Sequence, residues 1–226
     1  MIRTLTSIVL SIFLCTTSMA ATTAGDDDDF GPWDIVESTD TACSVQPAVR
    51  LSGGTFTDSI LGEPAVDAET ICRFVSRYNA DFHIGIAEAY LRIGRIYGIR
   101  GDVALCQAIV ETGWFRFADG TSVTPDQNNY CGLGVTKRGR KGHSFKSVEE
   151  GVTAQLQHLY AYATRTPLPK GETMIDPRFE MVSRGCATTW HDLNGRWAAN
   201  DRYGTQILDV YRRLLETANE SVTAAE

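Results

Sequence analysis

The sequence predicts a mainly α-helical domain over residues 56–220. Apolar residues recur at helical spacing in several segments of this region, and helix-capping residues stand at the ends of some of them. Strict alternation of apolar and polar residues, typical of sandwiches and barrels, is missing. A chain of 226 residues has room for one core and a small appendage, so we expect one folded domain.

The first two expected helices follow one another closely. Asp67 can cap the first helix. Its apolar stripe is Ala68, Ile71, Val75 and Tyr78. The second helix is expected over residues 85–97, with a stripe made of Ala87, Tyr90, Leu91 and Gly94.

A third helix is expected to begin near Gly101, with Asp102 as its N-cap, and to end before Gly113. One of its faces carries small and polar residues, namely Ala104, Gln107, Ala108 and Glu111. Alanines let a substrate approach closely, while Gln107 and Glu111 supply polar atoms. We therefore expect this face to border a substrate cleft.

Two more helices are expected downstream. Ser147 and Glu150 form a capping box at the start of the fourth helix. Its apolar positions are Val148, Val152, Leu156, Leu159 and Ala163. The last helix is expected over residues 201–216, with Tyr203, Ile207, Val210, Tyr211 and Leu214 on one face. Between these features, the turn at residues 137–142 suits a short β-hairpin over residues 134–145.

The N-terminus resembles a secretion signal. Arg3 precedes an apolar run over residues 5–14, and small residues flank Met19 at the expected cleavage site after Ala20. A membrane anchor needs about 20 apolar residues, and polar residues interrupt this run. We expect residues 1–20 to be removed and the protein to be secreted, extracellular or periplasmic, without a membrane span. Residues 21–55 are expected to form a polar, acidic arm, and residues 221–226 a tail.

The net charge and the cysteine pattern limit which partners, disulfides and metal sites we expect. A net charge of −7 argues against nucleic acid as a partner. Secretion permits disulfides, but the pairing among the five remaining cysteines stays open: Cys43, Cys72, Cys106, Cys131 and Cys186. No cysteine or histidine cluster has metal-ligand spacing, so we expect neither a metal site nor a cofactor.

Glu111 is placed like a general acid. The negative end of the helix macrodipole disfavours a carboxylate there, and Trp114, Phe115 and Phe117 are close in sequence. Desolvation by these aromatic side chains and the macrodipole both favour a raised pKa of Glu111. A carboxyl group with a raised pKa can hold a proton at neutral pH. The plainer interpretation is a surface glutamate paired with an arginine.

The loop over residues 124–136 has residues typical of a sugar-binding site. It offers hydrogen-bonding side chains at Asp126, Asn128 and Asn129. Tyr130 can stack on a pyranose ring, and Gly132 allows close backbone approach. Such an amide-rich loop can also be a simple turn.

Four stretches in this order resemble the bacterial endo-β-N-acetylglucosaminidase domain, glycoside hydrolase family 73. They lie at residues 101–114, 126–136, 144–155 and 197–207, and the similarity covers about residues 56–218. The resemblance implies a lysozyme-like helical fold with a long cleft. It also implies hydrolysis of the β-1,4 bond between N-acetylglucosamine and N-acetylmuramic acid in peptidoglycan, by an enzyme that we expect to be a monomer.

The resemblance assigns the catalytic acid to Glu111 and the functionally important tyrosine of the family to Tyr203, although the helical spacing of Tyr203 also fits a core tyrosine. The family's cleft-lining loop falls on Asn129, Tyr130 and Gly132. Gln107 and Trp114 are further candidates for the cleft wall.

The second catalytic group stays open. Candidate carboxylates are Asp126, Glu149, Glu150 and Asp201. The N-acetyl group of the substrate could replace an enzyme nucleophile, and we favour this route. Two rival functions are a lytic transglycosylase with the same type of fold and a non-catalytic glycan-binding protein.

Overall fold

The computed structural model describes residues 57–118, 121–135 and 141–223, with side chains up to residue 220. These residues form five α-helices: α1 (Ala68–Ser76), α2 (Ile84–Tyr97), α3 (Gly101–Thr112), α4 (Val148–Ala163) and α5 (Tyr203–Thr223). Three short 3-10 helices join them: η1 (Pro125–Gln127), η2 (Phe179–Met181) and η3 (His191–Leu193). Within this described part, β-pairing is limited to isolated bridges. The expected mainly helical fold is confirmed.

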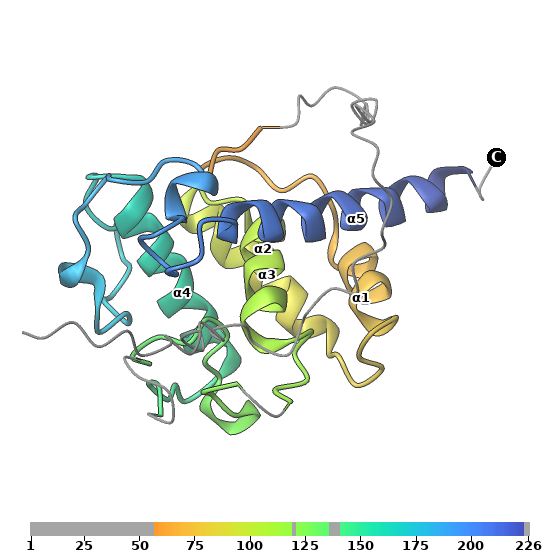
Figure 1. The fold of residues 1–226 in the computed structure, drawn as a ribbon, viewed down its shortest axis with the longest axis horizontal. Helices are drawn as coiled ribbons and strands as arrows, with labels where there is room; N and C mark the ends of the chain where they lie inside the picture. Colours follow the sequence, from red (N-terminus) through yellow and green to blue (C-terminus); the bar gives the residue numbers. More distant parts are fainter. Residues whose placement is uncertain (1–56, 119–120, 136–140, 224–226) are drawn as a thin grey trace, which may run out of the picture.

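Helix α3 lies in the middle of the molecule, between α2 and α5 (Figure 1). A Cβ atom on Gly101 would lie 2.2 Å from the backbone oxygen of Tyr90, so this glycine allows α2 and α3 to approach closely. Helix α5 crosses α3 and continues over α1, and α4 packs on α2. Almost every residue of α3 is buried as a result.

Several of the expected helix ends are confirmed, but the last helix, expected over residues 201–216, spans Tyr203–Thr223. The side chain of Asp67 accepts a hydrogen bond from the backbone nitrogen of Thr70 and caps α1, and Ser147 accepts one from Glu150 and caps α4. Gly113 ends α3 in the left-handed conformation, with φ of 57°. Because it lacks a Cβ atom, glycine adopts this conformation at little cost.

The expected cap of α3 is wrong. The N-cap is Arg100, and Asp102 lies in the first turn with its side chain fully buried. Its carboxylate accepts hydrogen bonds from the backbone nitrogens of Ala65 at 2.7 Å and Val103 at 2.9 Å. Asp102 therefore ties α3 to the segment before α1, a long-range role that local sequence cannot indicate.

The expected hairpin is absent from the described part of residues 134–145, where no strand is formed. One backbone hydrogen bond, from His143 to Leu133 at 2.7 Å, links the two sides of this region. The loop side chains Gln127 and Asn129 also donate to backbone carbonyls of residues 142 and 143. Side-chain hydrogen bonds thus help to hold this region together, where we expected backbone hydrogen bonds between two strands. Residues 136–140, which contain most of the expected turn, lie outside the described residues.

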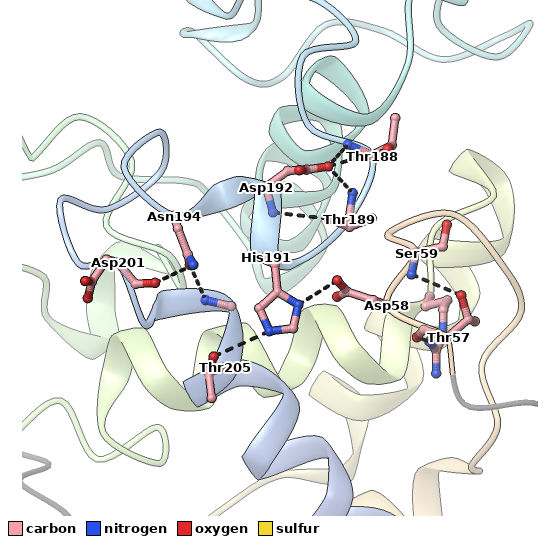
Figure 2. A network of polar contacts seen from close by, with 12 residues as sticks. Thr57, Asp58, Ser59, Thr188, Thr189, His191, Asp192, Asn194, Asp201 and Thr205 are labelled. Carbon is pink, nitrogen blue, oxygen red and sulfur yellow. Dashed lines mark hydrogen bonds and ion pairs between the residues drawn. The ribbon is translucent and has the colours of Figure 1, made fainter.

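The segment that leads into α5 is held by a network of short polar side chains (Figure 2). His191 lies between Asp58, whose carboxylate is 2.6 Å from Nδ1, and Thr205. Asn194 accepts a hydrogen bond from the backbone nitrogen of Gly204 at 2.7 Å and donates to the backbone oxygen of Asp201. These contacts fix where α5 begins, and therefore where its first residue lies.

The remaining expectations concern disulfides, the N-terminal segments and a membrane span. The four cysteines within the described residues, Cys72, Cys106, Cys131 and Cys186, are not joined by disulfides. Cys43, the expected signal at residues 1–20 and the expected arm at residues 21–55 lie outside the described residues. No helix in the described part of the chain has the length and apolarity needed to cross a bilayer.

Candidate active site

Glu111 is half-buried in the last turn of α3, beside the glycine that ends the helix. The other members of its expected face, Ala104, Gln107 and Ala108, are fully buried. Gln155 of α4 and Tyr203 of α5 both hydrogen-bond to Gln107, so these two helices help to cover the face. Three of the four residues therefore cannot border a substrate cleft, and only Glu111 is partly exposed on this face.

Two hydrogen-bond donors converge on one oxygen of Glu111. Trp197 Nε1 donates to Glu111 Oε1 at 3.1 Å, and the hydroxyl of Tyr203 donates to the same oxygen. Tyr203 is the first residue of α5, and Trp197 lies in the preceding loop. The carboxylate is thereby held in one orientation by groups from a different part of the chain.

Tyr203 is buried, with 3% of its surface exposed. Burial, followed by the nearby Glu111 carboxylate, raises the pKa of Tyr203 well above its ordinary value. Its hydroxyl therefore keeps its proton at neutral pH and acts as a donor to Glu111. Its oxygen accepts a second hydrogen bond, from Gln107 Nε2 at 2.9 Å.

Gly132 faces the other oxygen of Glu111. A Cβ atom on Gly132 would lie 3.9 Å from Oε2, and the backbone of Gly132 has φ of 66°. This conformation is costly for residues with a side chain. The loop over residues 128–134 therefore lies beside the carboxylate, as the sequence led us to expect.

The asparagines of this loop shape it from within. Asn129 is fully buried; its Nδ2 donates to the backbone oxygens of Leu133 and His143, both at 2.9 Å, and its Oδ1 accepts from the backbone nitrogen of Leu133. Asn128 donates to the backbone oxygen of Phe145 at 3.0 Å. The side chains that we expected to meet a sugar are thus engaged with the loop itself.

Tyr130 is also buried, with 4% of its surface exposed. It packs edge-on or tilted against Tyr90, Phe115 and Phe117. Both faces of its ring are therefore less open to a pyranose than the sequence suggested, and burial raises the pKa of Tyr130 to about 12. Tyr130 therefore packs the loop against α2.

Comparison with known proteins assigns the chain to a family. The family model for glucosaminidase, described as mannosyl-glycoprotein endo-beta-N-acetylglucosaminidase, matches residues 87–216, more than half of the chain. The chain belongs to the glucosaminidase family. The resemblance stated from the four sequence stretches is confirmed. The match indicates that this chain carries a glycoside hydrolase domain, and it includes Glu111, the loop at residues 128–134, Trp197 and Tyr203.

A curated relative matches part of the chain. An uncharacterized protein of Borreliella burgdorferi is 37% identical over 134 residues, which are 59% of this chain and 64% of that protein. The similarity thus spans just under two thirds of the relative's length. No solved structure gives a significant match.

Two expected substrate-binding residues of the glucosaminidase domain lie apart from this arrangement. Trp114 stacks on Tyr78, with ring centroids 3.8 Å apart, and Arg213 lies over its ring at 5.3 Å. Arg213 follows Tyr203 by ten residues, about 15 Å along the axis of α5. Asp126 is exposed in η1, where a hydrogen bond with Thr124 lowers the pKa of its carboxyl group. Trp114 also packs edge-on against Phe74 of α1, so it lies between α1 and α5, while Asp126 lies in the turn.

Two of the other three candidate carboxylates have structural partners. Glu149 pairs with Arg92 on α2, and Glu150 accepts a hydrogen bond from the backbone nitrogen of Lys146 at 3.0 Å. Asp201 is exposed before the start of α5. None of these contacts joins a candidate carboxylate to Glu111 within the described residues.

Sequence reasoning missed the role of Trp197. Its indole packs edge-to-face on His158, with ring centroids 4.9 Å apart, and His158 Nδ1 is 2.7 Å from the buried carboxylate of Asp176. The ring that donates to Glu111 is thus supported by an aromatic contact and an anchored imidazole. A tryptophan six residues before the family tyrosine was the available signal, but nothing in sequence spacing points it at Glu111.

Proposed function

We propose that this glucosaminidase is a secreted peptidoglycan hydrolase that cleaves the β-1,4 bond between N-acetylglucosamine and N-acetylmuramic acid, with Glu111 as general acid. The observation that carries the proposal is the double hydrogen bond to Glu111 Oε1 from Tyr203 and Trp197. Family membership supports the class of reaction and the type of glycan. The secretion signal and the monomeric state rest on the sequence.

The hydrogen bonds suggest which oxygen carries the catalytic proton. Oε1 accepts from two donors, Tyr203 and Trp197, so the proton of the acid belongs on Oε2. Oε2 faces Gly132, and the glycosidic oxygen would approach from that side of the loop. A hydrogen atom at Gly132, in place of a side chain, leaves room for the sugar.

The same donors would assist the chemical step. As Glu111 gives its proton to the leaving oxygen, negative charge develops on its carboxylate. Hydrogen bonds to an ionised acceptor are stronger than bonds to a neutral one, so the bonds from Tyr203 and Trp197 tighten as the reaction proceeds. Interactions that strengthen in the transition state are the ones that accelerate the reaction.

Attack on the anomeric carbon is assigned to the N-acetyl carbonyl oxygen of the substrate. This route needs no enzyme nucleophile and is known among glycoside hydrolases that act on N-acetylated sugars. It is consistent with the structural contacts of Glu149 and Glu150, which are engaged at the start of α4. Asp126, exposed in η1, is the remaining loop carboxylate to test.

Digestion of purified peptidoglycan tests the proposal. Wild-type enzyme should release fragments with N-acetylglucosamine at the new reducing end, identified by borohydride reduction and mass spectrometry. Glu111→Gln should release none, while Glu88→Gln, an exposed change on α2, should match the wild type. Anhydromuramic ends would indicate a transglycosylase and overturn the proposal. Binding of glycan without any cleavage by the wild type would indicate a binding protein.

A further inference from the structure

A file of buried polar side chains runs from Glu111 into the core. It consists of Tyr203 from α5, Gln107 from α3, Gln155 from α4 and Tyr90 from α2. Each of these four side chains has at most 3% of its surface exposed. The file thus takes one residue from each of four helices, and successive residues are joined by hydrogen bonds. Structural cores are mostly apolar, so a continuous polar file next to a catalytic carboxylate requires an explanation.

The file has one hydrogen-bond direction, and Gln155 fixes it. Gln155 Nε2 donates to the backbone oxygen of Ala104 at 3.1 Å, and a carbonyl oxygen can only accept. The amide of Gln155 is therefore oriented with Oε1 toward Tyr90, whose hydroxyl must donate to it. Gln155 Nε2 also donates to Gln107 Oε1 at 2.8 Å.

The orientation then passes to the active site. Because Gln107 Oε1 accepts from Gln155, its Nε2 is turned toward Tyr203 and donates to the hydroxyl oxygen at 2.9 Å. A hydroxyl group has one proton. With its oxygen already accepting from Gln107, Tyr203 directs that proton to Glu111 Oε1.

We propose that Gln107, Gln155 and Tyr90 are positioning residues that fix the proton of the Tyr203 hydroxyl on Glu111. The inference rests on the proposed role of Glu111 as the acid. The three residues act through Tyr203 and need no contact with the glycan, which agrees with their burial. Gln107, which the sequence placed on the cleft wall, takes a place behind it.

Burial makes the arrangement rigid. Rotating either amide by half a turn would bring two oxygens or two N–H groups together in the absence of water, and buried polar groups without partners are costly. Burial also raises the pKa of Tyr90 well above its ordinary value, so its hydroxyl remains a donor. The direction of the file is therefore maintained across the neutral pH range.

Substitution of the amides tests the inference. Gln155→Met and Gln107→Met keep side-chain length and remove the amide, so the Tyr203 proton loses its fixed direction. Soluble glycan strands provide the substrate, and kcat and KM are measured separately. We expect kcat to fall roughly 10-fold for each variant while KM stays within about twofold, because only the acid is disturbed.

A double-substitution cycle separates positioning from general stability. In a Tyr203→Phe background, which has no hydroxyl to orient, Gln155→Met should lower kcat no further. A further fall of similar size in that background would overturn the inference, because the amide would then act by another route. Wild-type kcat in Gln155→Met and Gln107→Met would also overturn it.

Tyr90→Phe gives a milder variant in case the amide substitutions fail to fold. It deletes only the oxygen at the far end of the file, and we expect a kcat reduction of about twofold to fivefold that disappears in the Tyr203→Phe background. An unchanged kcat would contradict the assignment of Tyr90. Tyr97→Phe is the matched control, since it deletes the same atom from the same helix but its hydroxyl contacts Gln157 and Glu172.

The result is distinguishable from failure of the proposed function. If Glu111→Gln cleaves peptidoglycan as well as the wild type, the assignment of the acid is wrong. If Glu111→Gln is inactive and the variants of Gln107, Gln155 and Tyr90 keep their wild-type kcat, the acid stands and the positioning file alone is wrong.

Discussion

The hydroxyl of Tyr203 donates a hydrogen bond to Oε1 of Glu111 while its oxygen accepts one from Gln107. Tyr203 is the first residue of α5, and Glu111 lies in the last turn of α3. Glu111 is therefore oriented by the packing of two helices. If it is the proposed acid, changes at this contact should alter catalysis more than binding.

Tyr203→Phe should lower kcat by roughly 100-fold, with little change in KM, because it removes a donor to the charge that develops on Glu111. The phenyl ring keeps the packing of α5, so thermal unfolding should shift only slightly. Steady-state kinetics on soluble glycan strands check the first expectation, and calorimetry the second. A rise in KM with unchanged kcat would instead indicate a direct contact with the sugar.

Trp197→Phe should lower kcat by roughly 10-fold to 100-fold, since it removes the second donor to Glu111 Oε1. Trp190→Phe is the matched control, because the indole nitrogen of Trp190 is buried without a hydrogen-bond partner in the structure. That control should lose stability through packing and keep its kcat. Equal kinetic losses in the two variants would show that the Trp197 N–H has no special role.

Gly132→Ala should reduce activity beyond what backbone strain explains. The new methyl group would lie 3.9 Å from Glu111 Oε2, on the side where the glycosidic oxygen is proposed to approach. Gly98→Ala is the matched control. Gly98 has φ of 63°, close to the 66° of Gly132, and no atom lies within 4 Å of its new Cβ. Both variants should lose about 1 kcal/mol of stability. Only Gly132→Ala should lose roughly tenfold or more in kcat/KM.

Gly151→Ala should displace the loop that lies beside Glu111. A Cβ atom on Gly151 would lie 1.7 Å from the backbone oxygen of Asn128, so either α4 or the loop must move. We expect a marked fall in both the unfolding temperature and the cleavage rate. Gly171→Ala, where a Cβ meets no atom within 4 Å, should leave the cleavage rate unchanged.

Asp67→Ala should destabilise the protein by about 1 kcal/mol at pH 7, because it removes the cap of α1. Hydrogen bonds with Thr70 lower the pKa of Asp67 in the folded protein. A lowered carboxyl pKa stabilises the fold above the unfolded-state value of about 4, and this stabilisation is lost as the pH falls through the folded-state pKa. The difference between wild type and Asp67→Ala in urea unfolding should therefore shrink below pH 4.

The periodicity of apolar residues predicted all five helices, because a helix is specified mainly by neighbours a few residues apart. The expected range 85–97 differs from α2 by one residue at its start, and Asp67 and Ser147 cap the helices they were expected to cap. Asp102 was assigned wrongly because its partner, Ala65, is 37 residues away. The hairpin was expected from a turn whose residues are largely outside the described chain.

At the site, the resemblance to the family indicated Glu111 and Tyr203, and the structure brings them together. The helical spacing also put Gln107 on the face of Glu111, and that part is correct. It could not reveal that α4 and α5 cover the position of Gln107. The burial of Asn129 and Tyr130 was equally hidden, since polar and aromatic residues in a loop suit both a binding surface and an internal brace.

The sequence by itself determined the helices, some of their ends and the position of Glu111 in the last turn of α3. Only the tertiary structure decided which polar side chains reach Glu111 and in which direction their hydrogen bonds run. Local spacing sets which residues share a face, but burial and hydrogen-bond direction depend on elements far apart in the chain. Tyr203 and Trp197 meet Glu111 across 92 and 86 residues, and those contacts exist only once α5 has packed on α3.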